Sequence, residues 1–77
     1  GKGFADLVFI PKHGFEKQYA TIVIELKWNQ SANTALEQIK ERNFTQDLEG
    51  TSDAILLVGI NYDTKSKIHS CEIEAMI

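Results

Sequence analysis

The sequence predicts an α/β fold, an α+β mixed sheet with one main helix and the element order β-β-α-β-β. Three observations lead to this prediction. Two apolar, strand-like segments, 3–10 and 21–28, flank a loop that contains the only proline. Residues 32–43 place apolar side chains at helical spacing, and 53–60 and 68–77 again have the composition of strands.

Residues 21–28 form the most strongly strand-like segment, because their first four positions are all β-branched. Strand side chains alternate between faces, so Val23, Glu25 and Lys27 point to one face. The opposite face receives Ile22, Ile24, Leu26 and Trp28. A carboxylate and an ammonium therefore emerge side by side from an apolar strand, where they need water, a counter-charge or a metal. A surface ion pair on an edge strand has the same Glu-x-Lys spacing, and this alternative stays open.

The loop between the first two strands determines how they pair. Residues 11–18 contain the only proline and a glycine and are typical of a hairpin loop. If Ile10 pairs with Thr21, the antiparallel register places Asp6 directly opposite Glu25 and on the same face. Two facing carboxylates are destabilising unless a positive group lies between them, and a hard divalent cation meets that need. A slip of one residue in the register would separate the two acids.

A helix is predicted to follow the second strand, with Ser31 as its N-cap. One face of this helix is expected to carry Ala32, Ala35, Leu36, Ile39 and Asn43. Phe44 and Leu48 are out of phase with that face. We therefore expect the helix to bend or restart near Asn43 and to stop at Gly50.

The last two strands complete the predicted sheet. Residues 53–60 are apolar throughout, as expected for a central strand covered on both faces. Because they follow a helix, they are predicted to pair in parallel with 21–28 through a right-handed crossover. Residues 61–67 predict a polar turn, and 68–77 alternate like a half-exposed edge strand that is antiparallel to its predecessor. The apolar face of that strand comprises Cys71, Ile73, Ala75 and Ile77.

Length and composition limit the functions that the chain can have. At 77 residues it is predicted to be a single domain, 1–77. The single cysteine excludes an internal disulfide and no apolar run could span a bilayer, so we expect a cytoplasmic protein without membrane contact. The net charge of −3 is unfavourable for nucleic-acid binding, although a bound divalent metal would offset part of it. The cations considered for phosphate contacts are Lys2, Lys12, Lys17, Lys27, Lys40 and Arg42.

The acidic residues and the lysine lie in a familiar order. Asp6 is followed by Glu25-Leu26-Lys27 at the end of an apolar strand, and then by a helix that carries Gln38. This arrangement resembles the PD-(D/E)XK nuclease superfamily. More closely, the chain is similar to the C-terminal nuclease-like domain of bacterial AAA-ATPase-like proteins.

The resemblance covers nearly the whole chain. The similar stretches are 1–8, 22–28, 35–39 and 56–62, in the order that the family has them. Two positions depart from the pattern. Ala5 stands where the motif has proline, and Phe44 stands where related sequences often carry tyrosine, so a role for that hydroxyl is lost.

The resemblance implies a truncated restriction-endonuclease-like core that hydrolyses nucleic-acid phosphodiesters, with DNA as the expected substrate and Mg²⁺ or Mn²⁺ as the cofactor. It implies that Asp6, Glu25 and the backbone carbonyl of Leu26 hold the metal. Lys27 would orient the attacking water and stabilise charge in the transition state. Gln38 would orient the site or contact the phosphate backbone, although a solvated helix position is an equally good interpretation.

The superfamily core also has a helix and a strand ahead of the Asp6 strand, and this sequence lacks them. We therefore expect a C-terminal fragment of a longer protein, with a possible ATPase domain in the parent chain. One sheet face would lack its cover, which predicts self-association into a homo-oligomer. The alternative function is a catalytically inactive interaction or oligomerisation module attached to an ATPase. Binding of a divalent metal would distinguish the two functions.

Overall fold

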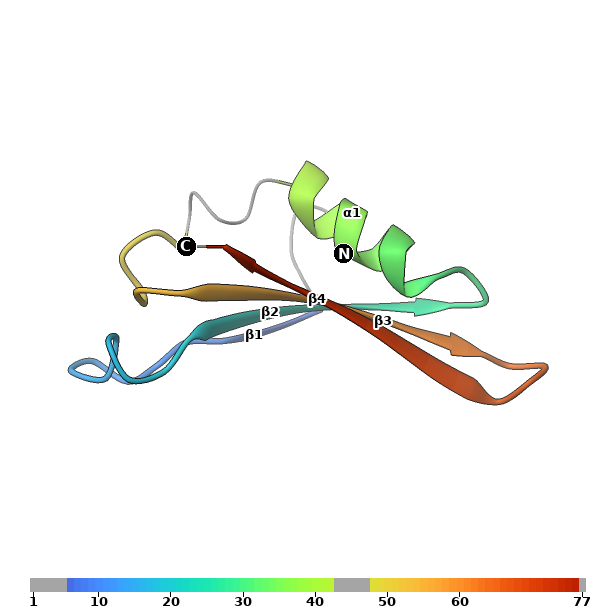
Figure 1. The fold of residues 1–77 in the computed structure, drawn as a ribbon, viewed down its shortest axis with the longest axis horizontal. Coiled ribbons are helices and arrows are strands. Elements are labelled where there is room, and N and C mark those ends of the chain that lie inside the picture. The colour runs from blue at the N-terminus through green and yellow to red at the C-terminus, as the bar shows by residue number, and fades with distance from the viewer. Residues whose placement is uncertain (1–5, 43–47, 77) are drawn as a thin grey trace.

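The computed structural model of the chain describes residues 6–42 and 48–76, which form a mixed four-stranded sheet and one helix. The elements are β1 (Leu7–Phe9), β2 (Thr21–Trp28), α1 (Ala32–Glu41), β3 (Ile55–Asp63) and β4 (Ile68–Met76). The strands lie in the sheet in the order in which they occur in the chain, and α1 lies across one face (Figure 1). The predicted fold class and element order are confirmed.

The first two strands pair in the predicted register. β1 is antiparallel to β2, with Leu7 opposite Ile24 and Phe9 opposite Ile22. Continued by one residue, this register places Asp6 opposite Glu25. The predicted first strand is longer than β1, and its first part lies outside the described residues.

The remaining strand pairs also follow the prediction. β3 is parallel to β2, with Val23 opposite Leu57 and Glu25 opposite Gly59, and α1 forms the connection between them. β4 is antiparallel to β3 and lies at the edge of the sheet. Residues opposite each other share a face, so Leu57, Gly59 and the carboxylate of Glu25 all lie on the side that α1 covers.

Helix α1 begins where the sequence predicts and packs directly on β3. The Ser31 hydroxyl accepts a hydrogen bond from the Thr34 amide at 2.9 Å, which satisfies one of the free N–H groups of the first turn. The buried face of the helix consists of Ala32, Ala35, Leu36 and Ile39. Leu36 and Ile39 join Val23 and Leu57 in the core, with Ile55 and Leu48 packed against it.

Three predictions about element boundaries and exposure need correction. The helix ends at Glu41 with Arg42 as its C-cap, and the bend predicted near Asn43 lies outside the described residues, as does Phe44. The turn predicted at 61–67 starts later, because β3 continues to Asp63 and pairs with β4 over its whole length. Strand β4 is more than half-exposed, since almost all of its residues are exposed on both faces.

The face of the sheet opposite α1 has no cover within the described part of the chain (Figure 1). The strand residues on this uncovered face carry no formal charge. Its exposed apolar side chains include Leu7, Phe9, Leu26, Trp28 and Ile73. Trp28 is 63% exposed, and its ring contacts the Tyr62 ring edge-on at a centroid distance of 5.4 Å. β3 is therefore central in the sheet, as predicted. Its apolar composition also predicts cover on both faces, but within the described residues only the face toward α1 is covered.

Gly59 allows α1 to approach the sheet closely, and this generates a prediction. A Cβ at this position would lie 2.4 Å from the Ala32 carbonyl oxygen and 2.8 Å from the Leu36 amide nitrogen. Both are backbone atoms, so relief requires the whole helix to move. We expect Gly59→Ala to lower the free energy of unfolding by about 1–3 kcal/mol in urea denaturation.

Ser70→Thr is the matched control for Gly59→Ala, because it adds one methyl group at an exposed position of β4. Its free energy of unfolding should stay within about 0.5 kcal/mol of wild type. Equal stability of Gly59→Ala and Ser70→Thr would contradict the close approach of α1.

Candidate active site

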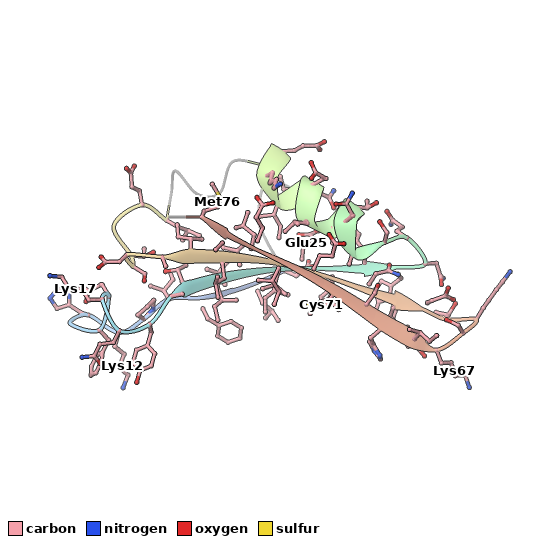
Figure 2. The ribbon with its side chains drawn as sticks, viewed as in Figure 1. Lys12, Lys17, Glu25, Lys67, Cys71 and Met76 are labelled. Carbon is pink, nitrogen blue, oxygen red and sulfur yellow. The ribbon has the colours of Figure 1, made fainter. Side chains whose placement is uncertain are left out.

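Glu25 is a buried carboxylate between the sheet and the helix. Its position in β2 directs the side chain toward α1, where only 2% of the residue is exposed (Figure 2). The Arg42 guanidinium lies 3.3 Å from Oε1, and the Lys27 ammonium lies 3.8 Å from Oε2. Burying an unpaired carboxylate would cost several kcal/mol, so these two cations are what permits the charge at this depth.

Asp6 directly precedes β1 and lies beside the same part of β2. Its Oδ2 accepts a hydrogen bond from the Leu26 amide at 2.7 Å, a short distance that is typical of an ionised acceptor. The carboxylate of Asp6 therefore lies beside the peptide bond that joins Glu25 to Leu26. Three residues predicted for the site therefore lie together: Asp6, Glu25 and Leu26. The β1–β2 register places Asp6 opposite Glu25, and the hydrogen bond joins Asp6 to Leu26.

Lys27 and Gln38 meet at a shallow groove of about 260 Å³ along one side of α1. The groove is lined by Lys27, Gln30, Asn33, Thr34, Glu37, Gln38 and Glu41. The Oε1 atom of Gln38 is buried and has no hydrogen-bond partner among the described residues. A buried acceptor without a partner is costly, so a water or ligand donor that reached this oxygen would relieve that cost.

Two asparagines stabilise the segment between β2 and α1, which follows Lys27 and leads into the helix. Asn61 lies opposite Lys27, is 5% exposed, and its Oδ1 accepts a hydrogen bond from the Gln30 amide at 2.9 Å. Asn29 has a φ of 56°, and its Oδ1 accepts from the Thr64 amide at 2.8 Å. Asparagine tolerates this left-handed conformation better than most residues. The polar composition of 61–67 predicts a turn and gives no sign of this structural role of Asn61.

Arg42 is the other site residue that sequence reasoning did not identify. Its charge alone places Arg42 only among the cations considered for phosphate contacts. A signal was present, because it is the only arginine and lies four residues after Gln38, on the same side of a helix. Its contact with Glu25 depends on how α1 crosses the sheet, which the sequence does not specify.

Lys40 lies on the side of α1 that faces β4. Its ammonium lies 2.8 Å from Glu74 and 3.5 Å from Glu37. The hydrogen bond to Glu74 raises the pKa of Lys40, so it stays charged well above neutral pH. Of the cations considered for phosphate, Lys12 and Lys17 lie in the loop at one end of the sheet, far from the Lys67 turn at the other (Figure 2). Lys2 lies outside the described residues, and among the described cations Lys27 and Arg42 contact Glu25.

The residues at Glu25 have the chemistry that a hard divalent cation needs. Asp6, Glu25 and the Leu26 carbonyl offer oxygen ligands, which Mg²⁺ and Mn²⁺ prefer. Glu25 already binds cations, since a guanidinium and an ammonium contact its two oxygens. Within residues 6–42 and 48–76 no group of three or more acidic, histidine or cysteine side chains could hold a metal. The protein would therefore supply two carboxylates, with a carbonyl and water completing the set.

A hairpin acid opposite a Glu-x-Lys strand, followed by a helix and a parallel strand, defines a restriction-endonuclease-like core. The model of the PD-(D/E)XK nuclease superfamily matches residues 1–72. The chain belongs to this superfamily. No curated protein and no solved structure matches it. The described part contains no helix long and apolar enough to cross a membrane.

The hydrogen bond from the Leu26 amide to Asp6 generates a stability prediction. Asp6→Ala removes the acceptor and should lower the free energy of unfolding by about 1 kcal/mol. Asp6→Asn keeps an acceptor oxygen at the same position, so it should lose less than half of that amount. Urea denaturation of both variants separates the structural role of Asp6 from any role of its charge. Equal losses of unfolding free energy in the two variants would contradict a structural role for the acceptor oxygen.

Proposed function

We propose that this chain is a metal-dependent nuclease domain that hydrolyses phosphodiester bonds in nucleic acid, with DNA as the expected substrate. The observation that carries the proposal is the convergence of Asp6, Glu25 and Lys27. Asp6 is bonded to the Leu26 amide, and the Lys27 ammonium lies 3.8 Å from Glu25. Membership of the superfamily supports the same reaction class.

Asp6, Glu25 and the Leu26 carbonyl would hold Mg²⁺ or Mn²⁺. When bound, the metal supplies positive charge beside the phosphate and makes a water more acidic. In the reaction, the water oxygen forms a new bond to phosphorus and one ester P–O bond breaks. The water gives up a proton, and the departing ester oxygen gains one from solvent. This chemistry needs no covalent nucleophile from the protein.

Lys27 and Gln38 would act on the water and the phosphate. The Lys27 ammonium is partly exposed at the groove, so it can contact a phosphate oxygen and stabilise the charge that develops on it. The buried Oε1 of Gln38 can accept a hydrogen bond from the attacking water and orient it. A partner of this kind would remove the cost of leaving that oxygen unpaired.

The metal sites and the reaction can be tested on the full-length protein. We expect calorimetric titration with Mn²⁺ to detect binding to wild type and to Lys27→Met, and no binding to Asp6→Asn or Glu25→Gln. Loss of one carboxylate leaves too few charged ligands for a cation that competes with water. Lys27→Met should lower kcat for cleavage of plasmid and single-stranded DNA at least about 100-fold, because we assign Lys27 to stabilising charge in the transition state.

Lys65→Met is the control for Lys27→Met, since it removes the same charge in the exposed β3–β4 turn. It should bind Mn²⁺ and cleave DNA like wild type. Absence of both metal binding and cleavage in the wild-type protein would overturn the nuclease proposal.

A second candidate function is a non-enzymatic interaction module, attached to an ATPase domain of the same protein. The uncovered face favours it, because its strand residues are mostly apolar and carry no formal charge. A second copy of the chain suits such a face, since two uncharged surfaces meet without repulsion or desolvation of charge. We therefore propose a homo-oligomer that forms through this face.

Self-association can be tested with two substitutions in β4. Ile73 and Ile68 are each 63% exposed, but Ile73 lies on the uncovered face and Ile68 has the opposite orientation. Sedimentation equilibrium should show dimers for wild type and Ile68→Lys, and monomers for Ile73→Lys. A folded wild-type monomer at all micromolar concentrations would contradict the proposal.

A further inference from the structure

Both oxygens of Glu25 are contacted by cations of the chain itself. Arg42 Nη1 lies 3.3 Å from Oε1, and Lys27 Nζ lies 3.8 Å from Oε2. Glu25 is 2% exposed, so the attraction is only weakly screened by solvent. A metal that binds Glu25 must therefore share an oxygen with Arg42 or Lys27, or displace one of them.

The charges of the described residues at Glu25 balance one another. Asp6 and Glu25 carry two negative charges, and Lys27 and Arg42 carry two positive charges. Glu37 and Glu41 line the groove, but both are exposed, so solvent screens them more effectively. A divalent cation would leave an excess of positive charge at a buried position, which is unfavourable until an anion arrives.

The chemistry of arginine suits both a carboxylate and a phosphate. The guanidinium is planar and always charged, and its N–H groups match the oxygens of either anion. Arg42 is at the C-cap of α1, and its side chain is about one-fifth exposed. A change of its side-chain rotamer would turn the guanidinium toward the solvent side of the site and leave the backbone of α1 in place.

We propose that Arg42 neutralises Glu25 while no metal is present and transfers to a phosphodiester oxygen when metal and nucleic acid bind. This inference rests on the proposed metal site. It makes Arg42 a residue that couples the two ligands: the metal alone binds weakly, and the phosphate anion strengthens metal binding. Thermodynamic reciprocity requires the metal to strengthen phosphate binding by the same factor.

The test measures Mn²⁺ affinity of the full-length protein by electron paramagnetic resonance. Titrations are run with and without a dithymidine phosphorothioate diester, which carries the phosphodiester charge and resists hydrolysis. A methylphosphonate dinucleotide, which has no charge on the linkage, is the ligand control. In wild type, the phosphorothioate should tighten Mn²⁺ binding about fivefold or more, and the methylphosphonate should not.

Arg42→Gln should tighten Mn²⁺ binding about fivefold in the absence of dinucleotide, because the competing cation is gone. The additional effect of the phosphorothioate should then be much smaller than in wild type. Lys40→Gln is the matched control, since it removes one charge from the same helix but on the side that faces Glu74. It should retain wild-type Mn²⁺ affinity and wild-type coupling.

Arg42→Lys provides a second variant in case Arg42→Gln does not fold, as judged by circular dichroism. It keeps the positive charge but loses the planar set of N–H donors of the guanidinium. It should therefore compete with Mn²⁺ like wild type, but phosphate should strengthen Mn²⁺ binding less than in wild type. If wild type binds Mn²⁺ and both Arg42 variants match it in affinity and coupling, Arg42 is only structural and the inference is overturned. If wild type binds no Mn²⁺, the proposed function itself fails.

Discussion

The close contact between α1 and Gly59 is the constraint on which the site depends. With no side chain at Gly59, the Ala32 carbonyl and the Leu36 amide can lie directly on β3. At this distance the apolar face of α1 reaches Leu57 and Val23, which supplies the core. Glu25 is the neighbour of Gly59 in the sheet, so the same contact encloses its carboxylate. One packing requirement thus determines both the stability of the fold and the burial of the acid.

Burial gives Glu25 properties that an exposed carboxylate lacks. An exposed pair with lysine contributes little, because water solvates both ions. At 2% exposure, Glu25 depends on Arg42 and Lys27 for neutralisation, and any change in one of the three alters the other two. Desolvation also strengthens the attraction for a cation with a higher charge density than a guanidinium.

The sequence predicts the strands of this fold better than it predicts the contacts of the helix. Strand pairing follows from alternation and a hairpin loop, so the facing of Asp6 and Glu25 could be derived from residue spacing alone. The position of Arg42 required the crossing of α1 over the sheet, which depends on Gly59 and on a helix that ends at Glu41. Asn61 was assigned to a turn because polar composition cannot show that its amide is buried against the Gln30 backbone.

Strand β2 serves two surfaces of opposite character because its side chains alternate. Val23, Glu25 and Lys27 face α1, whereas Leu26 and Trp28 face the uncovered side. A shift of one residue in the pairing of β2 would exchange these sets. Glu25 would then lie on the exposed, uncovered face and away from Arg42, where water solvates its charge. Val23 would leave the core that it forms with Leu36, Ile39 and Leu57, so the buried apolar side chains penalise the wrong register.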